Sequence, residues 1–315
     1  MLSRTADKLY WLSRYMERAE STARILDIAY RMSRAPVTDG MTRTEWSSAV
    51  TIAGHDQAFY DAFGEANEDS VIGYMALDPG NPSSIYSCIR TARENAREVR
   101  QSITTEMWES LNSTWLEIRD PERLDALTGD RRGFFDWVKE RSHLFRGVTV
   151  GTMLQDDAFQ FSRLGTFIER ADNTARILDV KYHVLLPGEE QVGGALDYSQ
   201  WAALLRSVSA YQVYRVVYRD TISPHRVAEL LVLRRDMPRS LHNCMASIVE
   251  HLDELSREYG CEYECQRLAG ELNARLRFAR IDELFRSGLH EFLTLFINRV
   301  AGLSDQIGRD FLMTV

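Results

Sequence analysis

The sequence predicts an all-α protein, and three of its features carry that prediction. Apolar residues recur at every third or fourth position along most of the chain, which is the spacing of one helix face. No stretch of convincing length alternates apolar and polar residues as a half-buried strand does. The segment 17–30 returns at 169–182 with ten of fourteen positions identical. We therefore expect a helical bundle of two tandem, divergent repeats of about 150 residues, related by a pseudo-two-fold axis, plus C-terminal helices.

The domain organisation follows from this repeat. Residues 1–150 form the first helical repeat, and 151–315 form the second with the C-terminal helices; the two are expected to make one compact unit. Asn81 followed by Pro82 is typical of a helix start, and 187–194 is interpreted as a linker. Helices are expected over residues 3–34, 41–62, 71–77, 82–117, 134–149, 152–186, 198–218, 225–233, 238–259, 262–280 and 281–311.

The composition excludes several classes of protein. A net charge of −8 argues against a nucleic-acid-binding protein, which normally carries a basic excess. There is no run of 18 apolar residues to span a membrane, and the first residues lack the apolar core of a signal peptide. The cysteines lack zinc-site spacing and are interpreted as small, buried or half-buried, reduced side chains, which favours a cytoplasmic location. They are Cys88, Cys244, Cys261 and Cys265.

The repeated helix carries charges that matter for any site. Leu26 lies on its main apolar stripe and Ile25 on the opposite side, and a helix that is apolar on two sides usually lies inside a bundle. Its charges would then be partly buried and would need ionic partners, forming a polar cluster. The alternative is a solvated face with a Glu20–Arg24 pair. The candidate residues are Glu17, Arg18, Glu20, Arg24, Glu169, Arg170, Asp172 and Arg176.

A row of arginines in the first half has no counterpart in the second. Arg90, Arg93 and Arg97 recur along one edge of the expected long helix, with Glu94 beside them. Guanidinium groups suit carboxylate or phosphate ligands, so this row is a candidate anion-binding edge. We also expect some of these arginines to pair with the carboxylates of the repeated helices inside the bundle. The alternative is that they lie along the helix surface with their charged ends in water.

Other site chemistries find little support. A carboxylate-bridged di-metal site in a helical bundle needs two Glu-x-x-His pairs, and the sequence has one, at Glu140 and His143. No glycine-rich phosphate loop is present, and no serine or cysteine has a base at a suitable helical spacing. We therefore assign no catalytic residue, no metal ligand and no cofactor.

Taken together, the motifs resemble one family. The duplicated Glu-Arg-Ala-acid helices, Asn81-Pro82-Ser83-Ser84, Arg93-Glu94-Asn95-Ala96-Arg97 and Gly151-Thr152-Met153 look like the bacterial Alpha-E domain, an all-helical domain named for its Glu-Arg motif. The resemblance covers nearly the whole chain. It implies neighbouring genes for a circularly permuted ATP-grasp ligase and a transglutaminase-like cysteine peptidase. It also implies a part in making or modifying a peptide or an amide-linked metabolite.

Three functions stay open at this point. The first is a cytoplasmic accessory or binding protein that holds a peptide or docks an ATP-grasp ligase. The second is an enzyme of the same pathway, with Glu17, Glu169 or Asp172 as acid or base and motif arginines stabilising charge. The third is a purely structural role for the Glu-Arg clusters. A transglutaminase-like protein is a further expected partner.

Overall fold

The computed structural model describes residues 1–34, 45–184 and 195–312, with no side-chain description at 180–184 and 195–197. Every regular element in these ranges is helical, which confirms the all-α fold class. The elements of the first half are α1 (Ser3–Ser33), α2 (Glu45–Ala53), α3 (Asp56–Phe63), α4 (Glu68–Ile72), a π-helical turn (Gly73–Leu77), α5 (Ile85–Glu98), a 3-10 turn (Arg100–Ser102), α6 (Thr105–Arg119), α7 (Pro121–Gly129) and α8 (Arg131–Thr152). Those of the second half are α9 (Asp157–Val184), α10 (Ala195–Ser207), α11 (Tyr211–Tyr218), α12 (Pro224–Ala228), a π-helical turn (Glu229–Leu233), α13 (Leu241–Tyr259), α14 (Glu264–Phe278), α15 (Ile281–Ser287) and α16 (Leu289–Phe311).

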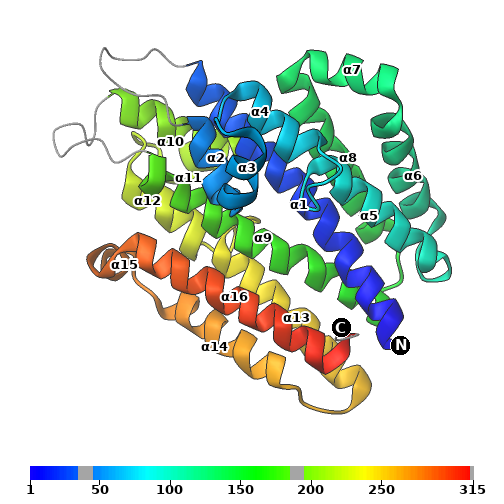
Figure 1. Cartoon of the computed structure of the whole chain (residues 1–315). Helices are drawn as coiled ribbons and strands as arrows, with labels where there is room; N and C mark the ends of the chain where they lie inside the picture. Colours follow the sequence, from blue (N-terminus) through cyan, green and yellow to red (C-terminus); the bar gives the residue numbers. More distant parts are fainter. Residues whose placement is uncertain (35–44, 185–194, 313–315) are drawn as a thin grey trace.

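Helices α1 and α9, which contain the repeated segment, pack directly on each other at the centre of the bundle (Figure 1). Helices α5 and α8 pack against α1, and α13 and α16 against α9. The two central helices approach so closely that a Cβ added at Gly165 would lie 2.1 Å from the carbonyl oxygen of Tyr10. Nearby, the hydroxyls of Ser13 and Ser162 share a buried hydrogen bond of 2.7 Å. The inward position expected for both repeated helices is confirmed.

The prediction of one long helix over 82–117 is wrong, because the chain turns near the middle of that segment and forms two helices. Helix α5 ends at Glu98 and α6 begins after Thr104, whose hydroxyl accepts a hydrogen bond from the Met107 amide at 3.3 Å. Asn81 is not the cap of α5 either. Ser84 caps it by accepting from the Ser87 amide at 3.1 Å, and the Asn81 side chain instead donates to the carbonyl of Tyr74 at 3.1 Å.

Three other expected helices are also divided. The helix over 41–62 separates into α2 and α3 at Gly54, where φ is +73°. The helix over 281–311 separates at Gly288, where φ is +94°. The helix over 198–218 separates near Ser209, whose φ is +58°. Residues 129–133, which lie between two of the expected helices, hold the end of α7 and the start of α8. Residues 41–44 and the linker at 187–194 lie outside the described residues.

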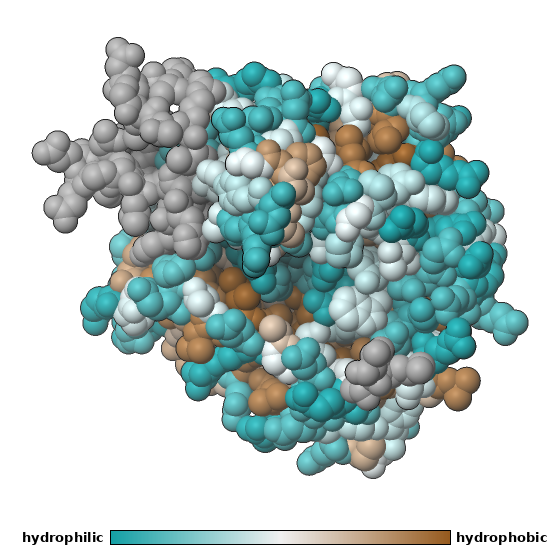
Figure 2. All heavy atoms as spheres, in the orientation of Figure 1, coloured by the Kyte–Doolittle hydropathy of each residue, from teal (hydrophilic) through white to brown (hydrophobic). Residues whose placement is uncertain are grey.

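Helix length and hydropathy bear on membrane association. Among the described residues, no helix combines the length and apolar character that a membrane span requires. The face seen in the space-filling view is largely hydrophilic, and it is hollowed near its middle (Figure 2).

Candidate functional site

The two copies of the motif bind each other reciprocally where α1 and α9 pack. Arg170 donates from Nε and Nη2 to the two carboxylate oxygens of Glu17, at 2.9 and 2.8 Å. Arg18 donates from Nε and Nη2 to those of Glu169, at 2.6 and 3.1 Å. Glu17 is 1% exposed and Glu169 3%. The solvated face that was the alternative is therefore wrong for these residues, and a buried ionic cluster takes its place.

Three further arginines complete the cluster around Glu17. Arg146 of α8 lies 2.7 Å from Glu17, and Arg239, just before α13, lies 3.2 Å from it. Both arginines also bind the fully buried carboxylate of Glu20, which in addition accepts from Arg24 at 2.7 Å. We call this group the inner cluster. Its members are Glu17, Glu20, Arg24, Arg146, Arg170 and Arg239.

The inner carboxylates remain ionised. Burial alone would raise the pKa of Glu17, but Arg170, Arg146 and Arg239 outweigh it and lower that pKa to about 2. Burial would also raise the pKa of Glu20, yet its guanidinium partners and the imidazole of His143 hold it well below the usual range. Each carboxylate oxygen accepts at least one hydrogen bond from an arginine, so the two glutamates are bound on both edges.

A second group, the outer cluster, lies on another side of the central helices. Glu169 accepts from Arg14 Nε at 2.8 Å as well as from Arg18. Burial would raise the pKa of Glu169, but these two arginines lower it to about 2. One helical turn further, Asp172 accepts from Arg176 Nε at 2.7 Å. The outer cluster consists of Arg14, Arg18, Glu169, Asp172 and Arg176.

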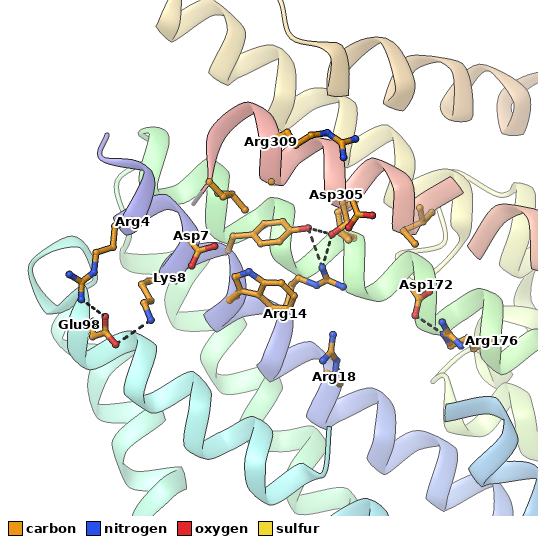
Figure 3. Close-up of a pocket in the computed structure, with 18 residues that line it drawn as sticks. Arg4, Asp7, Lys8, Arg14, Arg18, Glu98, Asp172, Arg176, Asp305 and Arg309 are labelled. Carbon is orange, nitrogen blue, oxygen red and sulfur yellow. Dashed lines mark hydrogen bonds and ion pairs between the residues drawn. The ribbon is translucent and has the colours of Figure 1, made fainter. Parts of the chain in front are cut away.

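The outer cluster borders a pocket of about 1030 Å³ between α1, α9 and α16 (Figure 3). Arg14, Arg18 and Arg176 line it, and Arg14 also donates from Nη1 to Ser304 of α16 at 2.7 Å. Further lining residues are Arg4, Asp7, Lys8, Glu98, Asp305 and Arg309. Arg176 borders a second hollow of about 380 Å³, together with His290 of α16. Arg176 therefore borders both hollows.

The arginines of the pocket keep part of their binding capacity. Within the described part of the chain, Nη2 of Arg14, Nη1 of Arg18 and Nη2 of Arg176 have no hydrogen-bond partner, while the other edges are held by Glu169 and Asp172. An arginine fixed by a carboxylate on one edge is already oriented to bind an anion with its free nitrogen.

The arginine row on α5 lies apart from both clusters. Arg93 and Arg97 bind Glu94 at 2.5 and 2.9 Å, and Arg90 lies over the ring of Tyr86. No ion pair among the described residues joins this row to Glu17, Glu20, Glu169 or Asp172, so the expected pairing is wrong. The row instead lies along the edge of its own helix.

Sequence reasoning missed Arg146 and Arg239, which supply half of the inner guanidinium contacts. One signal was available for Arg239. It follows Pro238 as Ser83 follows Pro82 in the matching stretch of the first half, so an arginine replaces a small residue just before a capping serine. Arg146 had no comparable signal. The described residues hold no group of three or more His, Cys, Asp or Glu side chains arranged to bind a metal ion.

Comparison with known proteins assigns the chain to a family of helical domains. The model of the Alpha-E family, described as a predicted alpha-helical domain with a conserved ER motif, matches residues 1–312. Uncharacterised proteins of Mycobacterium bovis and Mycobacterium tuberculosis align with the chain at 26% identity over 307 residues. The alignment covers 89% of this chain and 33% of each relative, so the chain spans about a third of their length. No solved structure matches. Two of the Glu-Arg pairs in this chain, at 17–18 and 169–170, bind each other reciprocally, and the chain belongs to the Alpha-E family.

Proposed function

We propose that this protein is a cytoplasmic binding module that holds an anionic group of a peptide or amide-linked metabolite for a partner ligase of the ATP-grasp type. The bound group is a carboxylate or phosphate, and it occupies the pocket between α1, α9 and α16. The motif glutamates act indirectly, because they fix the arginines that face the ligand. A transglutaminase-like protein is a further proposed partner of the same pathway.

One observation carries this proposal. Arg14, Arg18 and Arg176 border one pocket of about 1030 Å³, and each is held on one edge by a carboxylate at 2.6–2.8 Å. Fixing a guanidinium in advance lowers the entropy lost when a ligand binds. The pocket is in the range that suits a small ligand or a short peptide segment.

The enzyme alternative receives less support from the same residues. A general acid or base works best when its pKa lies near the operating pH. The pKa of Glu17 and of Glu169 is about 2, because several guanidinium groups surround each carboxylate. Such groups stay ionised at neutral pH, and their oxygens are occupied by arginine nitrogens. A purely structural role for the Glu-Arg clusters leaves the pocket arginines unexplained.

Two features support a role beside a ligase. The resemblance implies that Alpha-E genes neighbour ATP-grasp genes, and about two thirds of the length of each mycobacterial relative lies outside the matching region. A domain that is found within longer polypeptides is suited to present a bound group to another domain.

We also propose that the two halves are tandem repeats related by a pseudo-two-fold axis. The reciprocal motif pairs support this, as does local structure: Ser84 and Ser240 cap α5 and α13 alike, by accepting from the amides of Ser87 and Asn243. Each cap follows a π-helical turn, Gly73–Leu77 or Glu229–Leu233. If the two halves share one backbone arrangement, the proposed anion binding depends on side chains that differ between them.

The test uses pairs of fluorescent peptides that differ only in a free C-terminal carboxylate or its amide. We expect the acid to bind and the amide to bind at least about tenfold more weakly, since one charge-assisted contact is worth over 1.4 kcal/mol. Arg176→Ala should weaken acid binding to a similar degree. Arg267→Ala, which removes an exposed arginine paired with Glu264, is the matched control. Equal binding of acids and amides, or no effect of Arg176→Ala, would contradict the proposal.

A further inference from the structure

The inner cluster contains more positive than negative charge. Its two carboxylates, Glu17 and Glu20, are already bound by four arginines. A fifth arginine, Arg163, lies over the same ring as Arg170, because their Cζ atoms are 4.7 and 5.4 Å from the ring centroid of Phe167. Four guanidinium groups therefore bind two carboxylates, and a fifth lies beside them without binding either one. Buried charges are normally paired, so this excess calls for an anion that the protein does not supply.

Arg163 is the guanidinium without a protein acceptor. Its side chain is partly buried, and among the described residues it makes no ion pair or hydrogen bond. It instead lies 4.7 Å from the ring centroid of Phe167 and 6.0 Å from that of Phe159. Burial and the neighbouring guanidiniums of Arg170 and Arg146 lower the pKa of Arg163 to about 10. A guanidinium flat against aromatic rings keeps its edge available for an oxyanion.

The other groups around Arg163 add no negative charge. His251 of α13 stacks on Phe167 at 5.7 Å and shares a hydrogen bond of 2.7 Å between its Nδ1 and Gln160. Burial and the charge of Arg163 lower the pKa of His251 to about 4, so its ring is neutral at neutral pH. Glu17 is the one carboxylate that acts appreciably on Arg163, and it is occupied by three other arginines.

We propose that Arg163, with Arg146 and Arg170 beside it, binds an oxyanion group, a phosphate or a carboxylate, at a site distinct from the pocket of the outer cluster. Arg163 and Arg170 are about two helical turns apart and share one face of α9, whereas Asp172 and Arg176 lie on the opposite face. None of the three proposed residues lines the pocket between α1, α9 and α16. The ligand's charge offsets the excess of guanidinium groups.

Chemical modification of the intact protein by phenylglyoxal tests this site without any substitution. Phenylglyoxal reacts with arginines, and the low pKa of Arg163 should make it reactive near pH 8.5. Mass spectrometry of the digested protein gives the modification rate at each arginine, with and without 20 mM inorganic phosphate or acetate. We expect the ligand to slow modification of Arg163 at least about fivefold. Arg277, an exposed arginine that lies over Phe278, is the internal control and should be unaffected.

The two anions separate the sources of the ligand. Protection by phosphate alone assigns a phosphate site, protection by acetate alone assigns a carboxylate site, and protection by both assigns a general oxyanion site. Protection by neither, or equal protection of Arg277, overturns the proposal. In a second experiment, the anion that protects Arg163 should raise the melting temperature of the wild type and of Arg176→Ala, but raise that of Arg163→Ala at least twofold less. An equal rise in Arg163→Ala would also overturn it.

Discussion

Replacing Glu169 by glutamine should destabilise the fold through the outer cluster. Glu169 is 3% exposed and accepts charge-assisted hydrogen bonds from Arg14 and Arg18. Its pKa is about 2, against 4.5 for a free glutamate, which corresponds to about 3 kcal/mol of folding free energy at neutral pH. Removal of one partner from a buried ion pair typically costs about 3–5 kcal/mol, and the two figures agree.

The pH dependence of this loss is a sharper test than its size. Above pH 4.5 the carboxylate is ionised in both the folded and the unfolded chain, so its full contribution is present. Below pH 4.5 the unfolded chain binds a proton first, and the contribution disappears as the pH falls towards 2. The difference between the wild type and Glu169→Gln should therefore be constant from pH 7 to 5 and shrink from pH 4.5 to 2.

Urea unfolding followed by circular dichroism at pH 7, 5 and 3 measures this difference. Glu271→Gln is the control, because Glu271 is exposed and pairs with the exposed Arg267. It should change stability by less than about 0.5 kcal/mol at every pH. A loss below 1 kcal/mol for Glu169→Gln at pH 7, or a loss that does not shrink below pH 4.5, would refute the reasoning.

Three further outcomes follow from the packing and the titrating groups. Gly165→Ala should lower the free energy of unfolding by about 1–3 kcal/mol, measured by thermal or urea unfolding, because the added Cβ would meet the carbonyl of Tyr10. Gly147→Ala is the control and should stabilise the protein, because the space around Gly147 is open. The pKa of His251 is about 4 in the folded protein, against 6.5 in the unfolded chain, so the free energy of unfolding of the wild type should fall by about 2–3 kcal/mol between pH 6.5 and 4. His251→Phe should flatten this part of the profile of stability against pH. An unchanged slope would show that His251 is not the group responsible. Burial raises the pKa of Cys88 and Cys244 to about 12 and also raises that of Cys265, so these three thiols should react slowly at pH 8. A thiol-specific disulfide reagent should therefore label the exposed Cys261 quickly. Cys261→Ser should remove that fast labelling.

The sequence predicts the existence of the helices better than their ends. Val99 and Ile103 are both buried, so the apolar pattern continues through the turn between α5 and α6 as if one helix ran on. No proline or glycine marks the break. The remaining signal is Thr104, which caps α6, and a lone threonine is too common to decide a boundary. A helix end of this kind depends on tertiary packing.

The inward face of the motif is predictable, whereas its partners are not. Apolar residues on two sides of α1, such as Leu26 and Ile25, correctly placed the Glu-Arg charges inside the bundle. Arg146 and Arg239 reach Glu17 across 129 and 222 residues, and periodicity within one helix holds no information about such contacts. The pairing of the α5 arginines with the motif carboxylates was wrong for the same reason. Their spacing placed them on one edge of a helix, but it did not show whether that edge faces the motif or the solvent.

The amount of buried charge favours a binding role over a scaffold role for this motif. A buried ion pair contributes little net stability, and well-packed apolar residues of similar volume are often as good or better. The centre of this bundle nevertheless holds the carboxylates of Glu17, Glu20 and Glu169, each bound by at least two arginines. What such a network adds is orientation, because a guanidinium held on one edge presents the other in a fixed direction. On the outer side that direction is the pocket between α1, α9 and α16, and on the inner side it is the surroundings of Arg163. Under the two proposals made above, the duplicated motif supports arginines that serve two different anion-binding faces.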